Sequence, residues 1–224
     1  MSKYLENNRI AVLVANGFDN RDYFSVTGKL KQHGIKVTVI SPEEDRVKSS
    51  KAFEDDVVVN SDNENYFIRV DQHPEDANPC EFQLLFIPGG VFSIYKLISD
   101  NESSRFAKNF YDLQKPIALI SHGVRILSEF ENIKGRLMTS PVEYKDFFRK
   151  MGAFWMNDEV VVDENLITCN EAKNIDVFTE SVIQALMQGM SIDEFKKKLR
   201  EKRRKKTDSF WAENNANQKL RNDN

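Results

Sequence analysis

Cysteine and histidine are scarce in this chain of 224 residues. Two cysteines, Cys80 and Cys169, are too few for a disulfide framework, and three scattered histidines lack the spacing of a zinc cluster. No apolar run approaches the length of about 20 residues that spans a bilayer, and the first ten residues lack the order of a secretory signal. We therefore expect a cytoplasmic protein with no membrane segment, no metal and no cofactor, in which both cysteines are buried as small apolar residues.

The charge is small overall and unevenly distributed. The formal net charge is -3, but residues 191–224 contain 11 Lys or Arg against six Asp or Glu. This segment therefore has a charge of +5 and residues 1–190 have a charge of -8. We predict a domain over residues 1–190 and a basic extension over 191–224 that is partly helical or disordered. The stretch 196–206 (KKKLREKRRKK) is either a contact for a polyanion or a solvated helix face.

Short apolar runs alternate with segments of helical spacing along residues 9–187. The expected strands are 9–15, 36–40, 82–87, 116–120, 136–140, 160–162 and 166–168, and the expected helices are 22–33, 104–113, 124–130 and 175–187. Two further segments, 57–60 and 66–70, flank turn-forming residues and predict either a hairpin beside the main sheet or an irregular excursion. This alternation predicts an α/β fold in which helices cover both faces of an open, mostly parallel sheet.

Three expected strands end in segments that contain candidate site residues. These segments are Asn16-Gly17 with Asp19 and Asp22, then Pro88-Gly89-Gly90, and then Ser121-His122-Gly123. Ligands of open parallel sheets bind outside the carboxyl ends of the strands. We therefore expect the three segments to converge on one crevice.

Ser121 stands between an apolar strand and an expected helix, which is the place of a nucleophile at a tight turn. The N–H groups of Gly90 and His122 are then candidate donors to an oxyanion. Simpler roles remain open at each position. Ser121 would cap the helix that follows, His122 would be a core or interface residue, and Asp19 and Asp22 would be turn and helix N-terminal residues.

Five segments in this order resemble the ThiJ/PfpI (DJ-one) superfamily, which has a class I glutamine amidotransferase-like fold. They are VLVANGFDNRDYF, LLFIPGG, KPIALISHG, KGRLMTS and MGAFWMNDEVVVDENLIT, and the resemblance runs from about Arg9 to Met187. It implies a flavodoxin-like three-layer sandwich that is often dimeric. Members of the family are described as intracellular peptidases, glyoxalases, deglycases, redox-stress sensors and chaperones.

The resemblance assigns the site residues and also shows where this chain departs from the family. It implies catalytic positions at Ser121, His122 and Asp22, and ligand-binding positions in the same crevice at Gly89, Gly90, Gly123 and Asp19. Serine replaces the family's cysteine at position 121, and Asp22 replaces a glutamate that is one methylene longer. A third departure is the segment 91–95, which lacks the acid that the peptidase branch contributes to a neighbouring subunit.

These departures predict a protein that binds more than it catalyses. A hydroxyl needs a dedicated base, whereas a thiol is partly ionised at neutral pH. We therefore expect a stress-related homodimer that binds a small carbonyl or carboxylate compound with weak or no peptidase, glyoxalase or deglycase turnover. The alternative is a serine-based intracellular hydrolase or amidase that uses Ser121 and His122.

Overall fold

The structure is a computed structural model, and it describes residues 8–51, 66–131 and 133–188. The chain divides into two units, Met1–Met187 and Gln188–Asn224, and the fold below is that of the first unit. The predicted strand 57–60, the boundary at residue 190 and the basic stretch 196–206 lie outside the described residues.

A six-stranded sheet forms the centre of this unit. Its order is β2-β1-β5-β6-β10-β9, and every neighbouring pair is parallel except β9 and β10. The strands are β1 (Arg9–Leu13), β2 (Lys36–Ile40), β5 (Leu84–Ile87), β6 (Ile117–Ile120), β9 (Val160–Asp163) and β10 (Leu166–Cys169). The predicted α/β class with a mostly parallel sheet is confirmed.

Two small sheets lie outside the main one. One pairs β3 (Arg46–Lys48) antiparallel with β4 (Phe67–Arg69), and the other pairs β7 (Leu137–Met138) parallel with β8 (Phe154–Trp155). The expected pairing of 66–70 with 57–60 stays a prediction, because 57–60 lies outside the described residues; within them, β4 pairs with β3.

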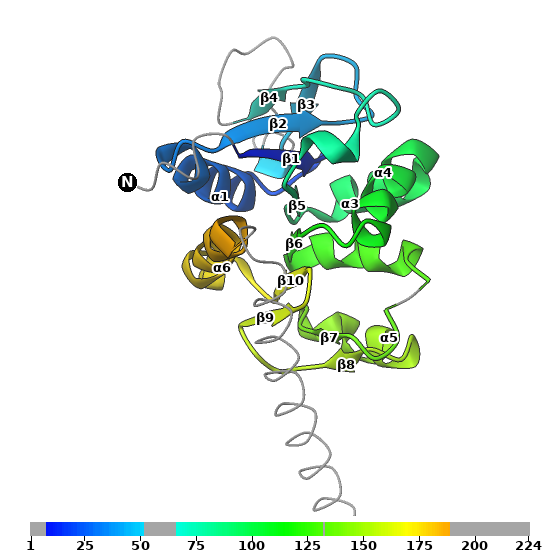
Figure 1. Cartoon of the computed structure of the whole chain (residues 1–224). Helices are drawn as coiled ribbons and strands as arrows, with labels where there is room; N and C mark the ends of the chain where they lie inside the picture. The colour runs from blue at the N-terminus through cyan, green and yellow to red at the C-terminus, as the bar shows by residue number, and fades with distance from the viewer. Residues whose placement is uncertain (1–7, 52–65, 132, 189–224) are drawn as a thin grey trace, which may run out of the picture. The chain divides into compact units, whose positions relative to one another are not determined.

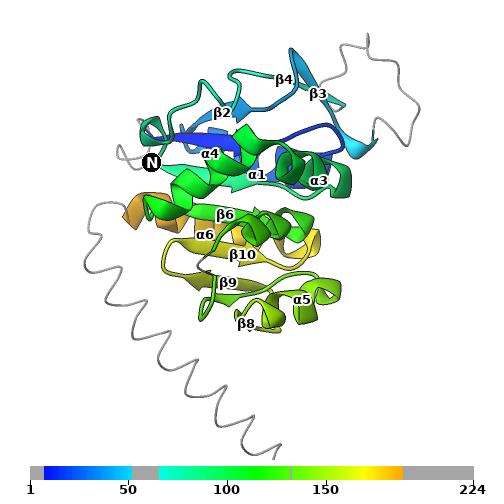
Figure 2. The same ribbon diagram turned by 90° about the vertical axis from the view of Figure 1, so that its right-hand side faces the viewer.

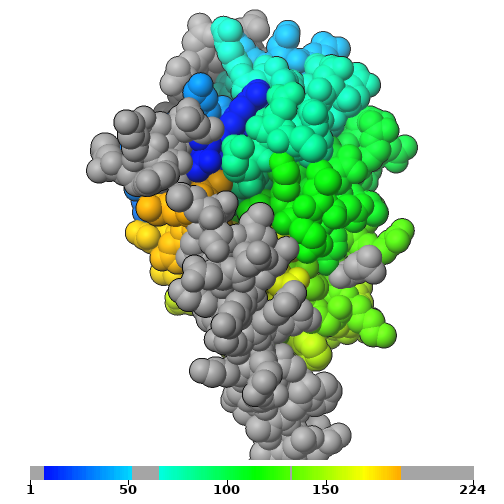
Figure 3. Space-filling view, viewed as in Figure 1, coloured from blue at the N-terminus to red at the C-terminus, as the bar shows by residue number. Residues whose placement is uncertain are grey.

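Helices form a layer on each face of the main sheet (Figure 1). They are α1 (Asn20–Gln32), α3 (Val91–Ser99), α4 (Asn101–Asp112), α5 (Lys145–Lys150) and α6 (Ile175–Gln188), with 3₁₀ helices η1 (Pro79–Glu81), η2 (Ser121–Glu129), η3 (Val142–Tyr144) and η4 (Ala172–Asn174). Figure 2 looks onto the α3 and α4 layer and shows α5 near the β9 edge. In the space-filling view, α6 (orange) and the green residues of the opposite layer lie on different sides (Figure 3).

Strand residues alternate between two apolar cores because successive side chains point to opposite faces. The core under α3, α4 and η2 contains Ala11, Leu13, Leu85, Ile87, Phe106 and Phe110. The core under α1 and α6 contains Ile10, Val12, Leu84, Phe86, Leu30 and Phe178. Burial on both faces explains why the parallel strands are continuous apolar runs.

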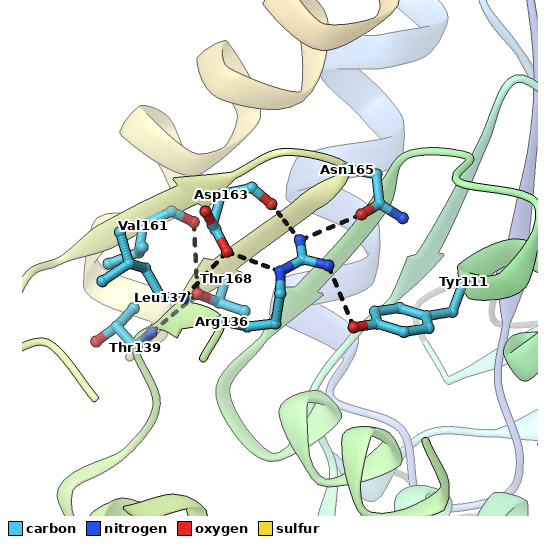
Figure 4. A network of polar contacts seen from close by, with 8 residues as sticks. All are labelled: Tyr111, Arg136, Leu137, Thr139, Val161, Asp163, Asn165 and Thr168. Carbon is cyan, nitrogen blue, oxygen red and sulfur yellow. Dashed lines mark hydrogen bonds and ion pairs between the residues drawn. The ribbon is translucent and has the colours of Figure 1, made fainter. Parts of the chain in front are cut away.

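A buried arginine connects β7 with the β9–β10 hairpin (Figure 4). Arg136 is 6% exposed, and its Nε donates to Asp163 Oδ2 at 2.7 Å. Its terminal nitrogens donate to Asn165 Oδ1 at 3.2 Å, to Tyr111 Oη at 3.2 Å and to the carbonyl of Asp163. The same Asp163 oxygen accepts Leu137 N–H at 3.0 Å. Charge and hydrogen-bonding capacity are thus matched inside the fold, as buried ions require.

The segment after β7 is held by further buried hydrogen bonds. Thr139 N–H donates to Thr168 Oγ1 at 2.9 Å (Figure 4), and Thr139 Oγ1 donates to the carbonyl of Asp158 at 2.7 Å. Trp155 Nε1 donates to Ser140 Oγ at 2.8 Å. The chain that leads into η3 therefore has a fixed course.

Candidate functional site

The three predicted segments converge at the carboxyl ends of β1, β5 and β6. A Cβ added to Gly90 would lie 2.3 Å from the carbonyl oxygen of Gly17 and 2.8 Å from Asp19 N. Asp19 N–H also donates to the carbonyl of Gly89 at 2.8 Å. Gly90 has a φ of +116°, so the turn after β5 needs glycine for its backbone conformation as well as for space.

Ser121 adopts a strained conformation at the end of β6. Its φ is +52°, in the left-handed region that costs a residue with a side chain on the order of 1–3 kcal/mol. Its Oγ lies 3.2 Å from His122 Nδ1, and η2 has no side-chain cap. The helix-cap alternative is therefore wrong for Ser121, whose hydroxyl contacts a ring nitrogen.

Asp22 is buried at 1% exposure on the first turn of α1. Burial, with a smaller contribution from nearby Asp19, raises the pKa of the Asp22 carboxyl to about 7, against the opposing hydrogen bond from Gly89. Oδ2 accepts Gly89 N–H at 3.1 Å, whereas Oδ1 has no hydrogen-bond partner among the described residues. Asp22 is therefore more than a helix N-terminal residue.

Asp19 has the simpler role. It is the N-cap of α1, and its Oδ1 accepts Asp22 N–H at 3.0 Å. This contact fixes the turn that positions Asp22.

Gly89 lies between the Asp22 carboxyl and Ser121. A Cβ at Gly89 would be 2.5 Å from Asp22 Oδ2 and 3.4 Å from Ser121 Oγ. Gly123 serves close packing, because a Cβ there would lie 2.6 Å from the carbonyl oxygen of Ile87. Gly90 comes directly before α3, so its N–H is a candidate donor to an oxyanion at this edge.

His122 has a carboxylate neighbour that the sequence reasoning missed. Its Nε2 lies 3.9 Å from Glu143 Oε1, and its ring packs edge-on against Tyr144 with centroids 5.8 Å apart. The sequence predicts no acid for His122, because the segment 91–95 after the glycine turn contains none. The sequence feature that points to Glu143 is its place in a turn that begins at Pro141, directly after the expected strand 136–140.

The cysteines are not substitutes for the nucleophile. Cys169 is buried, and burial raises the pKa of its thiol to about 12. Cys80 is exposed, so the prediction that it is buried was wrong because it lies on the surface helix η1 rather than in a strand.

A hollow of ≈ 450 Å³ lies away from this edge and is open to solvent. Arg9 and Lys36, the first residues of β1 and β2, line it with Asp71 and Gln72. Ser121, Asp22 and Gly89 are not among its lining residues. Within the described ranges, no group of three or more His, Cys, Asp or Glu side chains could hold a metal, and no helix is long and apolar enough to cross a membrane.

A family model described as DJ-1/PfpI matches residues 8–185, which include every described part of the site. The chain belongs to the DJ-1/PfpI family. The family and the flavodoxin-like α/β fold expected from the resemblance are confirmed.

Two bacterial proteins and one solved structure illustrate the relationship. "Putative cysteine protease YraA" of Bacillus subtilis is 27% identical over 180 residues, 80% of this chain and 99% of that protein. The uncharacterized protein SAV1875 of Staphylococcus aureus is 30% identical over 80% of this chain and 98% of its own. A ThiJ/PfpI domain protein from Brachyspira murdochii superposes with a TM-score of 0.69 at 22% identity, covering 81% of this chain and 97% of its own.

Proposed function

We propose that this DJ-1/PfpI protein binds a small compound with a carbonyl or carboxylate group at the ends of β1, β5 and β6. The observation that carries the proposal is the Asp22 carboxyl. Oδ2 accepts the Gly89 N–H, so the proton of the neutral acid resides on Oδ1. Buried polar groups need partners. Because Oδ1 is closed to solvent here, a ligand oxygen accepts this proton only after a neighbouring group moves aside.

The surroundings of Asp22 suit an oxygen-bearing ligand. Gly90 is the residue before α3, where the helix dipole favours negative charge, and its N–H is the candidate donor there. The Ser121 hydroxyl lies on the other side of Gly89. Family-type turnover is expected to be weak or absent because an un-ionised hydroxyl replaces the reactive thiol of the family.

Calorimetric titration with short 2-oxo acids and aldehydes at pH 6 tests this proposal. Asp22→Ala should abolish binding, whereas Asp22→Asn should retain it because the amide nitrogen still donates. Asp76→Ala, a change at an exposed acid, is the matched control. Affinity for the carboxylate ligands should fall above pH 7 as Asp22 ionises and repels them. Unchanged binding in Asp22→Ala would refute the proposed site.

Serine-based acyl transfer is the second candidate, favoured by the 3.2 Å contact between Ser121 Oγ and His122 Nδ1. In this reaction Ser121 Oγ bonds to the acyl carbon while its proton passes to His122. The leaving alcohol or amine takes that proton, and water then releases the acid. Labelling by a fluorophosphonate, which loses fluoride as Oγ bonds to phosphorus, should vanish in Ser121→Ala. No labelling of the native protein would exclude this candidate.

An exposed apolar rim beside the site is the proposed homodimer contact. Val91, Phe92 and Tyr95 of α3 are 40%, 73% and 54% exposed, and Val142 is 71% exposed. Tyr95 lies close enough to Tyr144 to influence its hydroxyl. Light scattering should give a dimer for the native protein and a monomer for Phe92→Glu. A native monomer would rule out this contact.

A further inference from the structure

The open hollow of ≈ 450 Å³ lies at the amino ends of β1 and β2. Its volume is within the range of pockets that hold small molecules. The lining comes from β1, α1, β2 and the segment after β4, and it includes Arg9, Lys31, Lys36, Val37, Thr38 and Asp71. Ser121 follows β6 at the carboxyl ends of the same parallel strands, so the hollow and the Ser121 crevice lie at opposite ends of the sheet.

The side chains of the hollow have an excess of positive charge. Arg9, Lys31 and Lys36 contribute three cations, and Asp71 is the one acid among the lining residues. Arg9 pairs with Glu81 at 3.0 Å. Lys31 and Lys36 are exposed, and neither forms an ion pair with another residue that the structure describes. Their charges are therefore available to an anionic ligand.

The guanidinium of Arg9 is held in a fixed orientation. Its Nε donates to Oγ1 of the buried Thr38 at 2.8 Å, and one terminal nitrogen donates to Glu81 Oε2 at 3.0 Å. The group also lies over the Phe82 ring, 4.8 Å from the ring centroid. These contacts reduce the side-chain entropy that Arg9 would lose on binding a ligand. A planar guanidinium that is already oriented suits the geometry of a phosphate group.

The outer edge of β2 adds a backbone donor. Lys36 N–H donates to the carbonyl of Asn8 on the β1 side, whereas Val39 N–H donates to Asp71 Oδ2 on the outer side. Because N–H groups alternate between the two sides of a strand, the N–H of Val37 also points to the outer side. Val37 lines the hollow, so its N–H is a neutral donor beside the three cations.

Asp71 makes one side of the hollow suitable for hydroxyl groups. Its backbone N–H donates to the carbonyl of Val39 at 3.0 Å, and its Oδ2 accepts Val39 N–H at 2.8 Å, so its place is fixed. A carboxylate has about four acceptor sites, which leaves Asp71 able to accept hydrogen bonds from a ligand. Its negative charge also repels a ligand that is anionic throughout. A ligand with an anionic group at one end and hydroxyl groups at the other therefore suits the hollow better than an anion alone.

We propose that this hollow binds a small sugar phosphate. The phosphate group contacts Lys31, Lys36 and the oriented guanidinium of Arg9, and hydroxyl groups of the sugar donate to Asp71. This ligand differs in chemistry and in place from the compound proposed for the Asp22 crevice. The two sites therefore fail or succeed independently of each other.

Calorimetric titration of the full chain with glucose 6-phosphate at low salt tests this proposal. The double variant Lys31→Ala/Lys36→Ala changes two exposed side chains, where substitutions have little effect on folding. Its affinity should fall about tenfold, because each exposed ion pair contributes a few-fold. Lys29→Ala is the matched control, because Lys29 also lies in the last turn of α1 but pairs with Asp176 and does not line the hollow. This control should bind with native affinity.

Two further measurements locate the ligand and define its class. In ¹H–¹⁵N spectra, glucose 6-phosphate should shift the Val37 amide of the native protein and leave it unchanged in the double variant. Inorganic phosphate and glucose should each bind more weakly than glucose 6-phosphate. Equal affinity for inorganic phosphate would overturn the assignment to a sugar phosphate. No binding by the native protein would overturn the site, as would equal binding by the double variant, which is expected if the basic stretch 196–206 holds the anion instead.

Discussion

Replacing Asp22 by asparagine should stabilise the protein at alkaline pH and have little effect near pH 4. Asparagine has nearly the same shape as a protonated aspartic acid. Its oxygen can accept Gly89 N–H in place of Oδ2, and its amide nitrogen takes the position of Oδ1. The substitution therefore keeps the neutral state of the site and removes the possibility of ionisation.

The magnitude follows from the raised pKa of Asp22. The carboxyl has a pKa of about 7 in the fold against 3.8 as its ordinary value. A carboxyl with a raised folded pKa binds its proton more tightly in the native state, so stability is lost as pH rises from about 4 to about 7. At 1.36 kcal/mol for each unit, the native protein loses about 4 kcal/mol over this range. Asp22→Asn does not lose it.

Urea denaturation of both proteins at a series of pH values from 4 to 9 measures this difference. Titration of all other groups is common to the two proteins and cancels in the comparison. The variant should gain stability relative to the native protein steadily between pH 4 and 7 and hold that gain above pH 8. A difference in unfolding free energy that does not vary with pH would show that Asp22 ionises normally in the fold.

Four further substitutions or truncations test other parts of the structure. Ser121→Cys should be alkylated by iodoacetamide at near-neutral pH faster than Cys80 or Cys169, because a helix start lowers a thiol's pKa; a rate equal to that of exposed Cys80 contradicts this. Ser121→Gly should stabilise the fold by up to about 1 kcal/mol in thermal unfolding by relieving the left-handed backbone, and a clear destabilisation would disprove the strain. Arg136→Met should lower the free energy of unfolding by about 3–5 kcal/mol in urea denaturation, because Asp163 stays buried without its cation; a loss below about 1 kcal/mol would show that the Arg136–Asp163 pair contributes little to stability. Deletion of residues 191–224 should reduce retention on a polyanion column in a salt-sensitive way, and equal retention would leave the basic stretch without that role.

Most of the sheet could be predicted because each parallel strand is a continuous apolar run. The runs at 36–40 and 116–120 match β2 and β6 to within one residue. Helix α3 was missed because its sequence, VFSIYKLIS, begins directly after the glycine turn and lacks a polar cap that marks a helix start. Strand β3 was missed because Val47 is the only buried residue among its three.

The sequence predicts the part of the site that depends only on the order of the parallel strands. Parallel strands bring Asp22, Gly89 and Ser121 to one edge by topology, without any knowledge of side-chain packing. Glu143 lies 22 positions along the chain from Ser121 on a short 3₁₀ helix. No periodicity relates them, so their proximity depends on the course of the chain after β7, which buried contacts at Arg136 set.

The positive φ of Ser121 has a consequence for how such a protein changes over time. The left-handed backbone penalises residues with a Cβ, and serine, cysteine and alanine, none of which is branched at Cβ, carry a similar conformational cost at position 121. Exchange of the reactive atom at this position then has little effect on the free energy of folding. By contrast, a Cβ at Gly89, Gly90 or Gly123 would displace neighbouring atoms. Single substitutions at position 121 can therefore add, alter or remove the chemistry of this site without changing the stability of the fold.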